Sequence, residues 1–208
     1  MMRELFDKYF CDKGSKHHYE LLYEKDFEKL RQLPINILEV GIYFGKSLEV
    51  WLEYFPNATI YAIDTFERVA AEDIPVLENP RVVWDICDST SDKAKDLWND
   101  VKFDIIIDDG MHTSTHNKLT FLNFYDKLKV GGAYYVEDVI QHNIVTPIDR
   151  LRGSYRETLS NNYYVMWGSI DKYNEMLDIF RRKGRKVFIY DLREFSNYID
   201  ACIIKITK

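Results

Sequence analysis

Short apolar runs recur along the first two thirds of the chain, and each ends in glycine, acidic or turn-forming residues. Continuous apolar runs of this length are typical of parallel strands that are buried on both faces. Between them, apolar residues return every three or four positions, which is the spacing of amphipathic helices. The predicted strands are residues 35–40, 59–63, 82–85, 103–107 and 133–136. Their alternation with helices predicts an α/β fold with a doubly wound, mostly parallel sheet and right-handed crossovers.

Residues 1–33 are predicted to form an N-terminal cap, made of helix and loop, that precedes the first strand. Residues 12–18 (DKGSKHH) are polar throughout and predict a loop. Apolar residues with helical spacing follow, so residues 19–33 predict a helix, which Pro34 closes.

The C-terminal part differs from the alternating region. A helix that ends at Gly184 is followed by residues 186–190 and 201–206, which predict an antiparallel strand pair at the C-terminal end of a seven-stranded sheet. Residues 139–169 form the one long irregular region, and a loop of this length is often a functional lid. We therefore expect residues 1–208 to form a single domain with a candidate lid.

Composition and charge narrow the classes of partner. The chain has 208 residues, of which 46% are hydrophobic and 15% aromatic, as expected of an ordered globular protein. A net charge of −6 gives no electrostatic reason to expect nucleic-acid binding, and no apolar run approaches the roughly 20 residues that span a membrane. Cys11, Cys87 and Cys202 are widely spaced, and no signal-peptide pattern is present, so we expect a cytoplasmic protein with free thiols.

Acidic residues follow several of the predicted strands. The segment FDIIIDDGMH at 103–112 ends in Asp108 and Asp109, with His112 three positions further on. Glu137 and Asp138 follow the fifth strand in the same way. Because ligands bind beyond the carboxyl ends of parallel strands, these side chains are predicted to share one crevice.

A glycine-containing loop, EVGIYFGKS at 39–47, joins the first strand to its helix. Only three residues separate Gly41 from Gly45, so the spacing is one residue short of a P-loop, and Tyr43 occupies the second glycine position of a dinucleotide fingerprint. The E-x-G-x-x-x-G pattern resembles the loop of S-adenosylmethionine-dependent methyltransferases. In those enzymes the acid that closes the next strand, here Asp64, accepts hydrogen bonds from both ribose hydroxyls. A tight β–α turn beside an ordinary surface aspartate is the alternative.

Several motifs together resemble one family, the class I methyltransferases of the macrocin O-methyltransferase type, which act on sugars of natural products. Methyltransferase-like proteins of cephamycin synthesis share part of the pattern, so a non-sugar acceptor stays open, as does a nucleotide-binding oxidoreductase on the same fold. The resemblance covers about residues 12–140 and rests on DKGSKHHY (12–19), LEVGIYFGKSL (38–48), FPNATIYAID (55–64), CDSTSD (87–92), IDDGMHTSTH (107–116) and LKVGGAYYVED (128–138).

The resemblance implies S-adenosylmethionine as cofactor, a divalent metal such as Mg²⁺, and specific residues for each. The implied cofactor-binding residues are Glu39, Gly41, Gly45, Ser47, Asp64, Asp88, Ser89 and Asp108, with Asp85 as a rival to Asp88. The implied metal ligands are Asp109, Glu137 and Asp138, and the implied general base is His112, with His116 and His142 as weaker candidates.

This residue set suits methyl transfer to a sugar hydroxyl, which is a poor nucleophile at neutral pH. A hard cation with oxygen ligands can bind the hydroxyl and lower its pKa, and an imidazole can then take the proton. Two alternatives remain open. His112 can be a helix-cap histidine, and adjacent residues of a regular strand face opposite ways, so Glu137 and Asp138 can share a metal only if the chain turns there.

The expected partner is a small-molecule acceptor, namely a sugar or a glycosylated or phosphorylated metabolite. Arg150, Arg152 and Arg156 either clamp a phosphate or carboxylate or form a solvated helix face. Lys13 and His17 either reach the active site or are solvated. A homodimer is expected from base rates alone.

Overall fold

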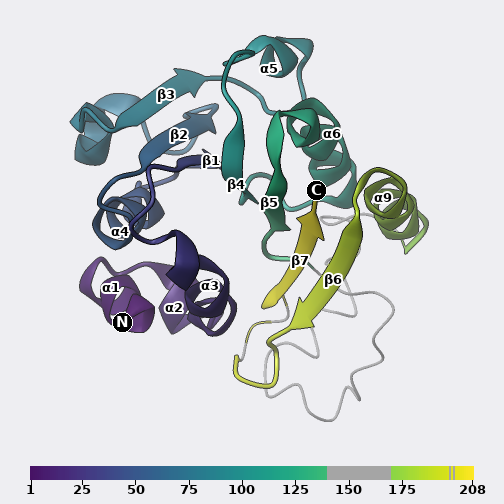
Figure 1. Cartoon of the computed structure of the whole chain (residues 1–208), viewed down its shortest axis with the longest axis horizontal. Helices are drawn as coiled ribbons and strands as arrows, with labels where there is room; N and C mark the ends of the chain where they lie inside the picture. The colour runs from purple at the N-terminus through teal and green to yellow at the C-terminus, as the bar shows by residue number, and fades with distance from the viewer. Residues whose placement is uncertain (140–169, 197, 199) are drawn as a thin grey trace.

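The computed structural model describes residues 1–139, 170–196, 198 and 200–208. Their strands form one seven-stranded sheet in the order β3-β2-β1-β4-β5-β7-β6 (Figure 1). β1 to β5 are parallel, whereas β7 is antiparallel to both β5 and β6. The predicted fold class is therefore confirmed. The strands are β1 (Asn36–Val40), β2 (Thr59–Asp64), β3 (Val82–Ile86), β4 (Phe103–Asp108), β5 (Leu128–Val136), β6 (Lys186–Asp191) and β7 (Cys202–Thr207).

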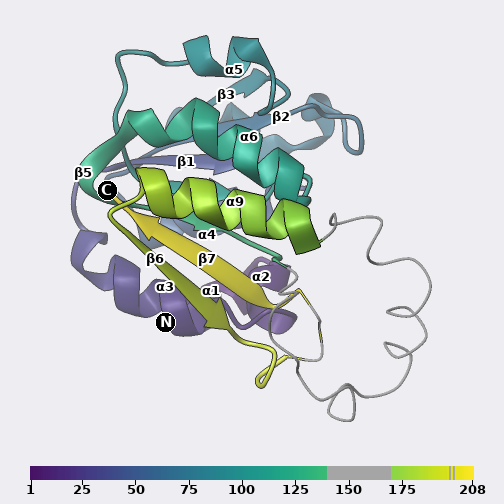
Figure 2. The same ribbon diagram turned by 90° about the vertical axis from the view of Figure 1, so that its right-hand side faces the viewer.

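Helices cover both faces of the sheet (Figures 1 and 2). The N-terminal helices lie with α4 on one face, and α6 and α9 lie side by side on the other. The helices are α1 (Met2–Lys8), α2 (Asp12–Ser15), α3 (Glu20–Phe27), α4 (Lys46–Tyr54), α5 (Asp92–Asp96), α6 (Ser114–Phe124) and α9 (Ile170–Lys183).

The central strand β4 shows why its sequence is continuously apolar. Ile105 and Ile107 pack into the core beneath α1, α3 and α4, whereas Ile106 packs into the core beneath α6 and α9. Successive side chains of a strand alternate between the two faces, and here helices cover both. Burying each such side chain contributes about 1.5–3 kcal/mol to folding. The carboxyl end of β4 is thereby held rigidly at the middle of the sheet.

Three predicted boundaries are wrong, and tertiary packing explains two of them. The stretch 12–18, predicted as a loop, contains the helical turn α2, in which Gly14 fits closely against Phe6, 2.5 Å from an added Cβ to the Phe6 Cβ. β5 begins at Leu128 and continues through Gly132, where an added Cβ would lie 2.8 Å from the Asp104 carbonyl oxygen. The helix predicted over residues 19–33 is shorter, since α3 ends at Phe27 and a 3-10 turn follows at Glu28–Leu30.

Some predictions fall on residues that the structure does not describe. The candidate lid lies outside the described residues except for Val139, and so do Arg150, Arg152, Arg156 and His142. Within the described residues, no helix is both long enough and apolar enough to cross a membrane. Each of the three cysteines is buried and unpaired.

Candidate active site

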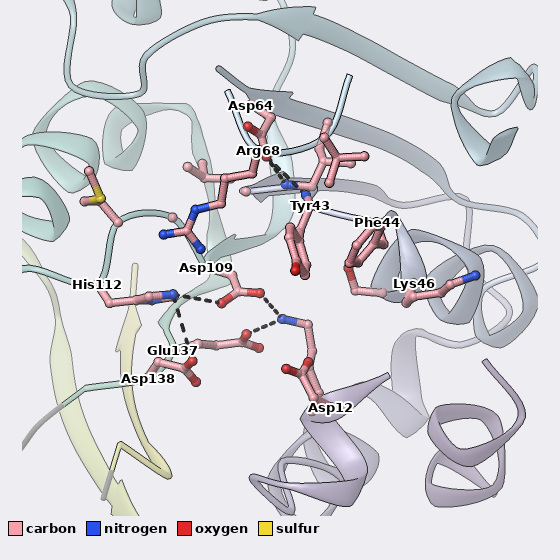
Figure 3. Close-up of a pocket in the computed structure, with 18 of the residues that line it drawn as sticks. Asp12, Tyr43, Phe44, Lys46, Asp64, Arg68, Asp109, His112, Glu137 and Asp138 are labelled. Atoms are coloured by element: carbon pink, nitrogen blue, oxygen red, sulfur yellow. Dashed lines mark hydrogen bonds and ion pairs between the residues drawn. The ribbon is translucent and has the colours of Figure 1, made fainter. Parts of the chain in front are cut away.

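A pocket of about 760 Å³ opens at the carboxyl ends of β1, β2, β4 and β5. The loop between β1 and α4 forms one wall, and the N-terminal segment around α2 forms another (Figure 3). Of the predicted site residues, the pocket is lined by Gly41, Ser47, Asp64, Asp88, Ser89, Asp109, His112, Glu137 and Asp138, together with Lys13, His17 and His116.

The loop after β1 can take its path only because it contains glycine at two positions. Gly41 has φ +92°, and a Cβ there would lie 2.2 Å from the carbonyl oxygen of Asp109. Gly45 has φ +71°, and a Cβ there would lie 2.6 Å from a methyl group of Val76. Gly41 therefore lets the loop pack directly on the backbone that carries Asp109.

We expect the Gly41→Ala substitution to reduce the free energy of unfolding more than Gly131→Ala. Both glycines have positive φ, which costs alanine about 1–2 kcal/mol, but an added Cβ at Gly131 (φ +86°) meets nothing within 4 Å. At Gly41 the clash with backbone adds about 1–3 kcal/mol. Urea denaturation of both variants measures the difference. Equal losses would contradict close packing of the loop on β4.

Asp64 is fixed at the end of β2 by backbone donors. Its Oδ2 accepts the N–H groups of Ile42 at 2.6 Å and Tyr43 at 3.2 Å, and its Oδ1 accepts that of Phe66 at 2.8 Å. A carboxylate has about four acceptor positions, and three of them are used here, so about one is left for a ligand in the pocket. Asp64 therefore has the position and the remaining acceptor capacity for a ligand hydroxyl.

The structure distinguishes between Asp85 and Asp88, the two candidate cofactor-binding residues near the end of the third strand. Asp88 and Ser89 line the pocket. Asp88 accepts hydrogen bonds from Thr90, which lower the pKa of its carboxyl group. Asp85 is not among the described lining residues and instead pairs with Lys93 at 3.0 Å. This geometry favours Asp88 over Asp85.

Glu39 and Asp108 lie behind the pocket wall that the described residues form. Glu39 is fully buried and accepts hydrogen bonds from Ser47 and Trp51, both at 2.9 Å. Burial raises the pKa of Glu39 to about 7 and that of Asp108 to about 6. Asp108 also accepts a hydrogen bond from Asn117 at 3.1 Å. In this structure both acids thus hold neighbouring elements in place.

Asp109, His112 and Asp138 meet at the opposite end of the pocket (Figure 3). The Nε2 atom of His112 lies 3.9 Å from Asp109 Oδ1 and 3.9 Å from Asp138 Oδ2. One ligand atom from each residue lies within 4.8 Å of the others, a spacing that fits a metal ion. Because a hard cation such as Mg²⁺ prefers oxygen, the carboxylates are suited to bind it and the imidazole to hold a proton.

The backbone turns sharply at two of these residues. His112 has φ +58° and Asp138 has φ +53°, and a left-handed conformation at a residue other than glycine costs about 1–3 kcal/mol. At Asp138 this is the turn that the sequence analysis required. Such strain is often found at functional sites, where surrounding contacts maintain it.

Lys13 is buried beside this cluster, so the solvated alternative for it is wrong. Its side chain is 3% exposed, and its Nζ lies 2.5 Å from Asp109 Oδ2 and 3.5 Å from Glu39 Oε1. It also pairs with Glu137, which is itself buried. Burial opposes the charge of the ammonium, but Asp109, Glu137 and Glu39 together raise the pKa of Lys13 well above its usual value. The Lys13 ammonium thus lies among three carboxylates inside the site.

The sequence analysis missed two tyrosines that hold the acids after β5. The Tyr19 hydroxyl donates to Asp138 Oδ1 at 2.6 Å and accepts the Asp138 N–H at 3.0 Å. The Tyr23 hydroxyl donates to Glu137. Their spacing of four residues places both on one helix face. The periodicity of apolar residues, however, does not indicate which group a tyrosine hydroxyl contacts. These contacts hold Asp138 in its left-handed conformation.

Two histidines and an arginine are among the other basic residues that line the pocket. His17 Nδ1 lies 3.8 Å from an oxygen of Asp138, so His17 reaches the site. His116 Nδ1 bonds to the Thr113 hydroxyl at 2.6 Å. The guanidinium of Arg68, which the sequence analysis did not single out, extends into the pocket between Asp64 and His112 (Figure 3).

Comparison with known proteins confirms the family resemblance. A family model described as a methyltransferase domain matches residues 38–139. The chain is 30% identical over 135 residues to 8-demethyl-8-(2-methoxy-alpha-L-rhamnosyl)-tetracenomycin-C 3'-O-methyltransferase of Streptomyces olivaceus, a match that covers 61% of this chain. It is 30% identical over 148 residues, 66% of this chain, to demethylmacrocin O-methyltransferase of Streptomyces fradiae.

These matches span only part of each relative. They cover 33% of the Streptomyces olivaceus protein and 36% of the Streptomyces fradiae protein. Among solved structures, MycE methyltransferase from the mycinamycin biosynthetic pathway, in complex with Mg, SAH and mycinamycin VI, aligns with a TM-score of 0.69 and 20% identity. That alignment covers 100% of this chain and 54% of MycE. The likeness establishes a shared fold.

Proposed function

Because residues 38–139 belong to the methyltransferase domain family, we propose that the chain is an S-adenosylmethionine-dependent, Mg²⁺-assisted O-methyltransferase. Its acceptor is a hydroxyl group of a sugar or of a sugar-containing metabolite. The observation that carries the proposal is one pocket with two chemically distinct ends, Asp64 at one and Asp109, His112 and Asp138 at the other. The relatives named for sugar O-methylation support the choice of acceptor.

The cofactor belongs at the end formed by β1, β2 and the segment after β3. Asp64 accepts a ribose hydroxyl, since it lines the pocket and is already oriented by the backbone of the glycine loop. Gly41 and Ser47 face the amino-acid part of the cofactor, and Asp88 and Ser89 face the adenine. The sulfonium methyl group then lies between these residues and the acidic end.

The reaction takes place at the acidic end. Asp109, Glu137 and Asp138 would hold the divalent cation, whose Lewis acidity would lower the pKa of the acceptor hydroxyl. His112 Nε2 would take the proton of that hydroxyl as its oxygen attacks the methyl carbon. The sulfonium would supply the methyl group and leave as a neutral thioether, so the positive charge would end on the His112 imidazolium.

Calorimetric titration with S-adenosylmethionine, with Mg²⁺ and with a chelator, tests the cofactor assignment. We expect binding in both conditions, because the cofactor end and the acidic end use different residues. Binding of NAD or ATP in place of S-adenosylmethionine would overturn the proposal. Methyl transfer to a panel of sugars and glycosides, with phosphorylated sugars and catechols alongside, then identifies the acceptor class.

Asp64→Asn is expected to weaken S-adenosylmethionine binding by about 10–100-fold, because a hydrogen bond to a charged group contributes about 1.5–3 kcal/mol. The asparagine oxygen can still accept the N–H groups of Ile42 and Tyr43, but its NH2 group would face the N–H of Phe66, so melting curves must show that the variant is folded. Asp85→Asn is the matched control, since Asp85 ends in an exposed pair with Lys93. Unchanged affinity in Asp64→Asn would contradict the ribose assignment.

A further inference from the structure

One cationic side chain of the pocket pairs with no other described residue. Among the described residues, the lysines and arginines that line the pocket are Lys13, Lys16, Lys46 and Arg68. Each of the three lysines forms an ion pair with a carboxylate of the chain. The guanidinium of Arg68 forms no ion pair or hydrogen bond with any residue that the structure describes. Its N–H donors are therefore available to a ligand.

The backbone around Arg68 is anchored on both sides. Two residues before it, Phe66 donates its N–H to Asp64 at 2.8 Å. Phe66 and Val69 are both partly buried and pack against the core on the same face of the sheet. The segment between these anchors is exposed, and the Arg68 side chain extends from it into the pocket, between Asp64 and His112 (Figure 3).

A guanidinium is better suited to an oxyanion than to a neutral hydroxyl. It presents five N–H donors in a planar fork and has no acceptor, so it matches the two oxygens of a carboxylate or of a phosphate group. A sugar hydroxyl offers a single oxygen, and its own O–H finds no acceptor on the guanidinium. The chemistry of Arg68 therefore favours an anionic group in the ligand.

The position of Arg68 favours the acceptor over the cofactor as the source of that group. The anionic group of S-adenosylmethionine is its carboxylate, which belongs to the amino-acid part at the loop between β1 and α4. In the view of Figure 3, Arg68 lies on the opposite side of Tyr43 from Phe44, the next residue of that loop. Its guanidinium extends instead toward His112, beside which the acceptor hydroxyl would lie.

Resting on the proposed function, we propose that Arg68 is a specificity-determining residue that binds a carboxylate or phosphate group of the acceptor. The sugar that the protein methylates is then anionic. Arg68 binds its charged group while His112 faces the hydroxyl that receives the methyl group, so the two residues together select which hydroxyl reacts.

Modification of arginines by phenylglyoxal, followed by mass spectrometry of the peptides, tests this inference without catalysis. With S-adenosylhomocysteine and Mg²⁺ present, we expect D-glucuronate or D-glucose 6-phosphate to slow the modification of Arg68, and D-glucose to have no effect. The anion that protects more strongly identifies the group as a carboxylate or a phosphate. Arg185, which is exposed and is not among the described lining residues, is the internal control and should react equally in all samples.

Two results of this experiment would overturn the inference and leave the proposed function intact. One is equal protection of Arg68 by D-glucose and the anions, or protection by none of them. The other is full protection by S-adenosylhomocysteine alone, which would place Arg68 against the cofactor. Absence of S-adenosylhomocysteine binding in calorimetry would instead overturn the proposed function, and the inference with it.

Kinetics of variants give a second test with the acceptor found in the panel. Arg68→Met is expected to raise the KM for an anionic acceptor by about 10–100-fold, because it removes hydrogen bonds between charged groups. Arg68→Lys keeps the charge but loses the fork, and should recover part of that loss. Lys46→Met is the matched control, since Lys46 also lines the pocket but pairs with Glu49 at 3.0 Å, and its KM should stay within about twofold.

Two further measurements separate acceptor specificity from a general defect. S-adenosylmethionine affinity in Arg68→Met should stay within about twofold of the unmodified value. Methyl α-D-glucuronoside and methyl α-D-glucoside, compared as acceptors, differ only in the carboxylate, so the variant should reduce kcat/KM for the first much more than for the second. An equal reduction for both, an unchanged KM, or a preference of the unmodified protein for the neutral sugar would overturn the inference.

Discussion

Replacing Asp109 with asparagine is expected to reduce the rate of methyl transfer by at least about 100-fold, because metal-ion catalysis supplies several kcal/mol of transition-state stabilisation. Asp109 Oδ1 lies 3.9 Å from His112 Nε2, and its replacement removes one carboxylate ligand of the cation. Initial rates with the acceptor found in the panel, at saturating Mg²⁺, measure the effect.

Two controls separate catalysis from folding and cofactor binding. S-adenosylmethionine affinity of Asp109→Asn should stay within about threefold of the unmodified value, because Asp64 and the glycine loop are retained. Asp109 also pairs with Lys13 at 2.5 Å, so melting curves must show that the variant is folded. An activity that survives in the folded variant, or a loss matched by lost cofactor binding, would contradict the metal role of Asp109.

The sheet and its functional edge could be predicted from the sequence because both depend on local patterns. Residues 105–107 are continuously apolar, as a strand covered on both faces requires. The strand and its end at Asp108 can therefore be predicted from neighbouring residues alone. Asp64 was found in the same way, by its place after a strand. Where a glycine or an acid stands directly at a strand end, position along the chain indicates position in space.

The surroundings of the acids could not be predicted, since they depend on residues far apart in the chain. Lys13 belongs to a polar stretch that looks solvated, yet α2 packs it beside the ends of β1, β4 and β5. Tyr19 looks like one apolar position of a helix, and only its hydroxyl contact with Asp138 shows its role. Glu39 matches a cofactor motif, but Trp51 and Ser47 occupy its carboxylate.

The strained backbone at His112 and Asp138 links the fold to the proposed chemistry. Both residues adopt positive φ, and the two side chains thereby face one another across the site at 3.9 Å. In an extended continuation of β5, Asp138 would point away from Glu137 and could not share a face with Asp109. Tyr19 stabilises the turn by binding both the carboxylate and the N–H of Asp138. The N-terminal cap is thus part of the active site.

His112→Ala is expected to lower kcat by about 100- to 10,000-fold, the usual contribution of a general base. Its Nε2 lies 3.9 Å from one oxygen of Asp109 and 3.9 Å from one oxygen of Asp138, so a hydroxyl bound at the cation would lie within its reach. Mn²⁺ affinity should change little, because the ligands are oxygens. His116→Ala is the matched comparison, since its Nδ1 is bonded to Thr113, and should cost less than about tenfold.

The pH profile distinguishes a base from a residue that only shapes the pocket. If His112 takes the proton, the pH profile of kcat has a limb that reports the general base, and His112→Ala loses that limb. In the variant, imidazole added to the solution should restore part of the rate by filling the space that the side chain leaves. A variant with unchanged kcat would exclude His112 as the base. A reduced kcat with the same pH limb would mean that His112 only positions other groups and that another residue is the base. His17 would be tested next, because its Nδ1 lies 3.8 Å from Asp138.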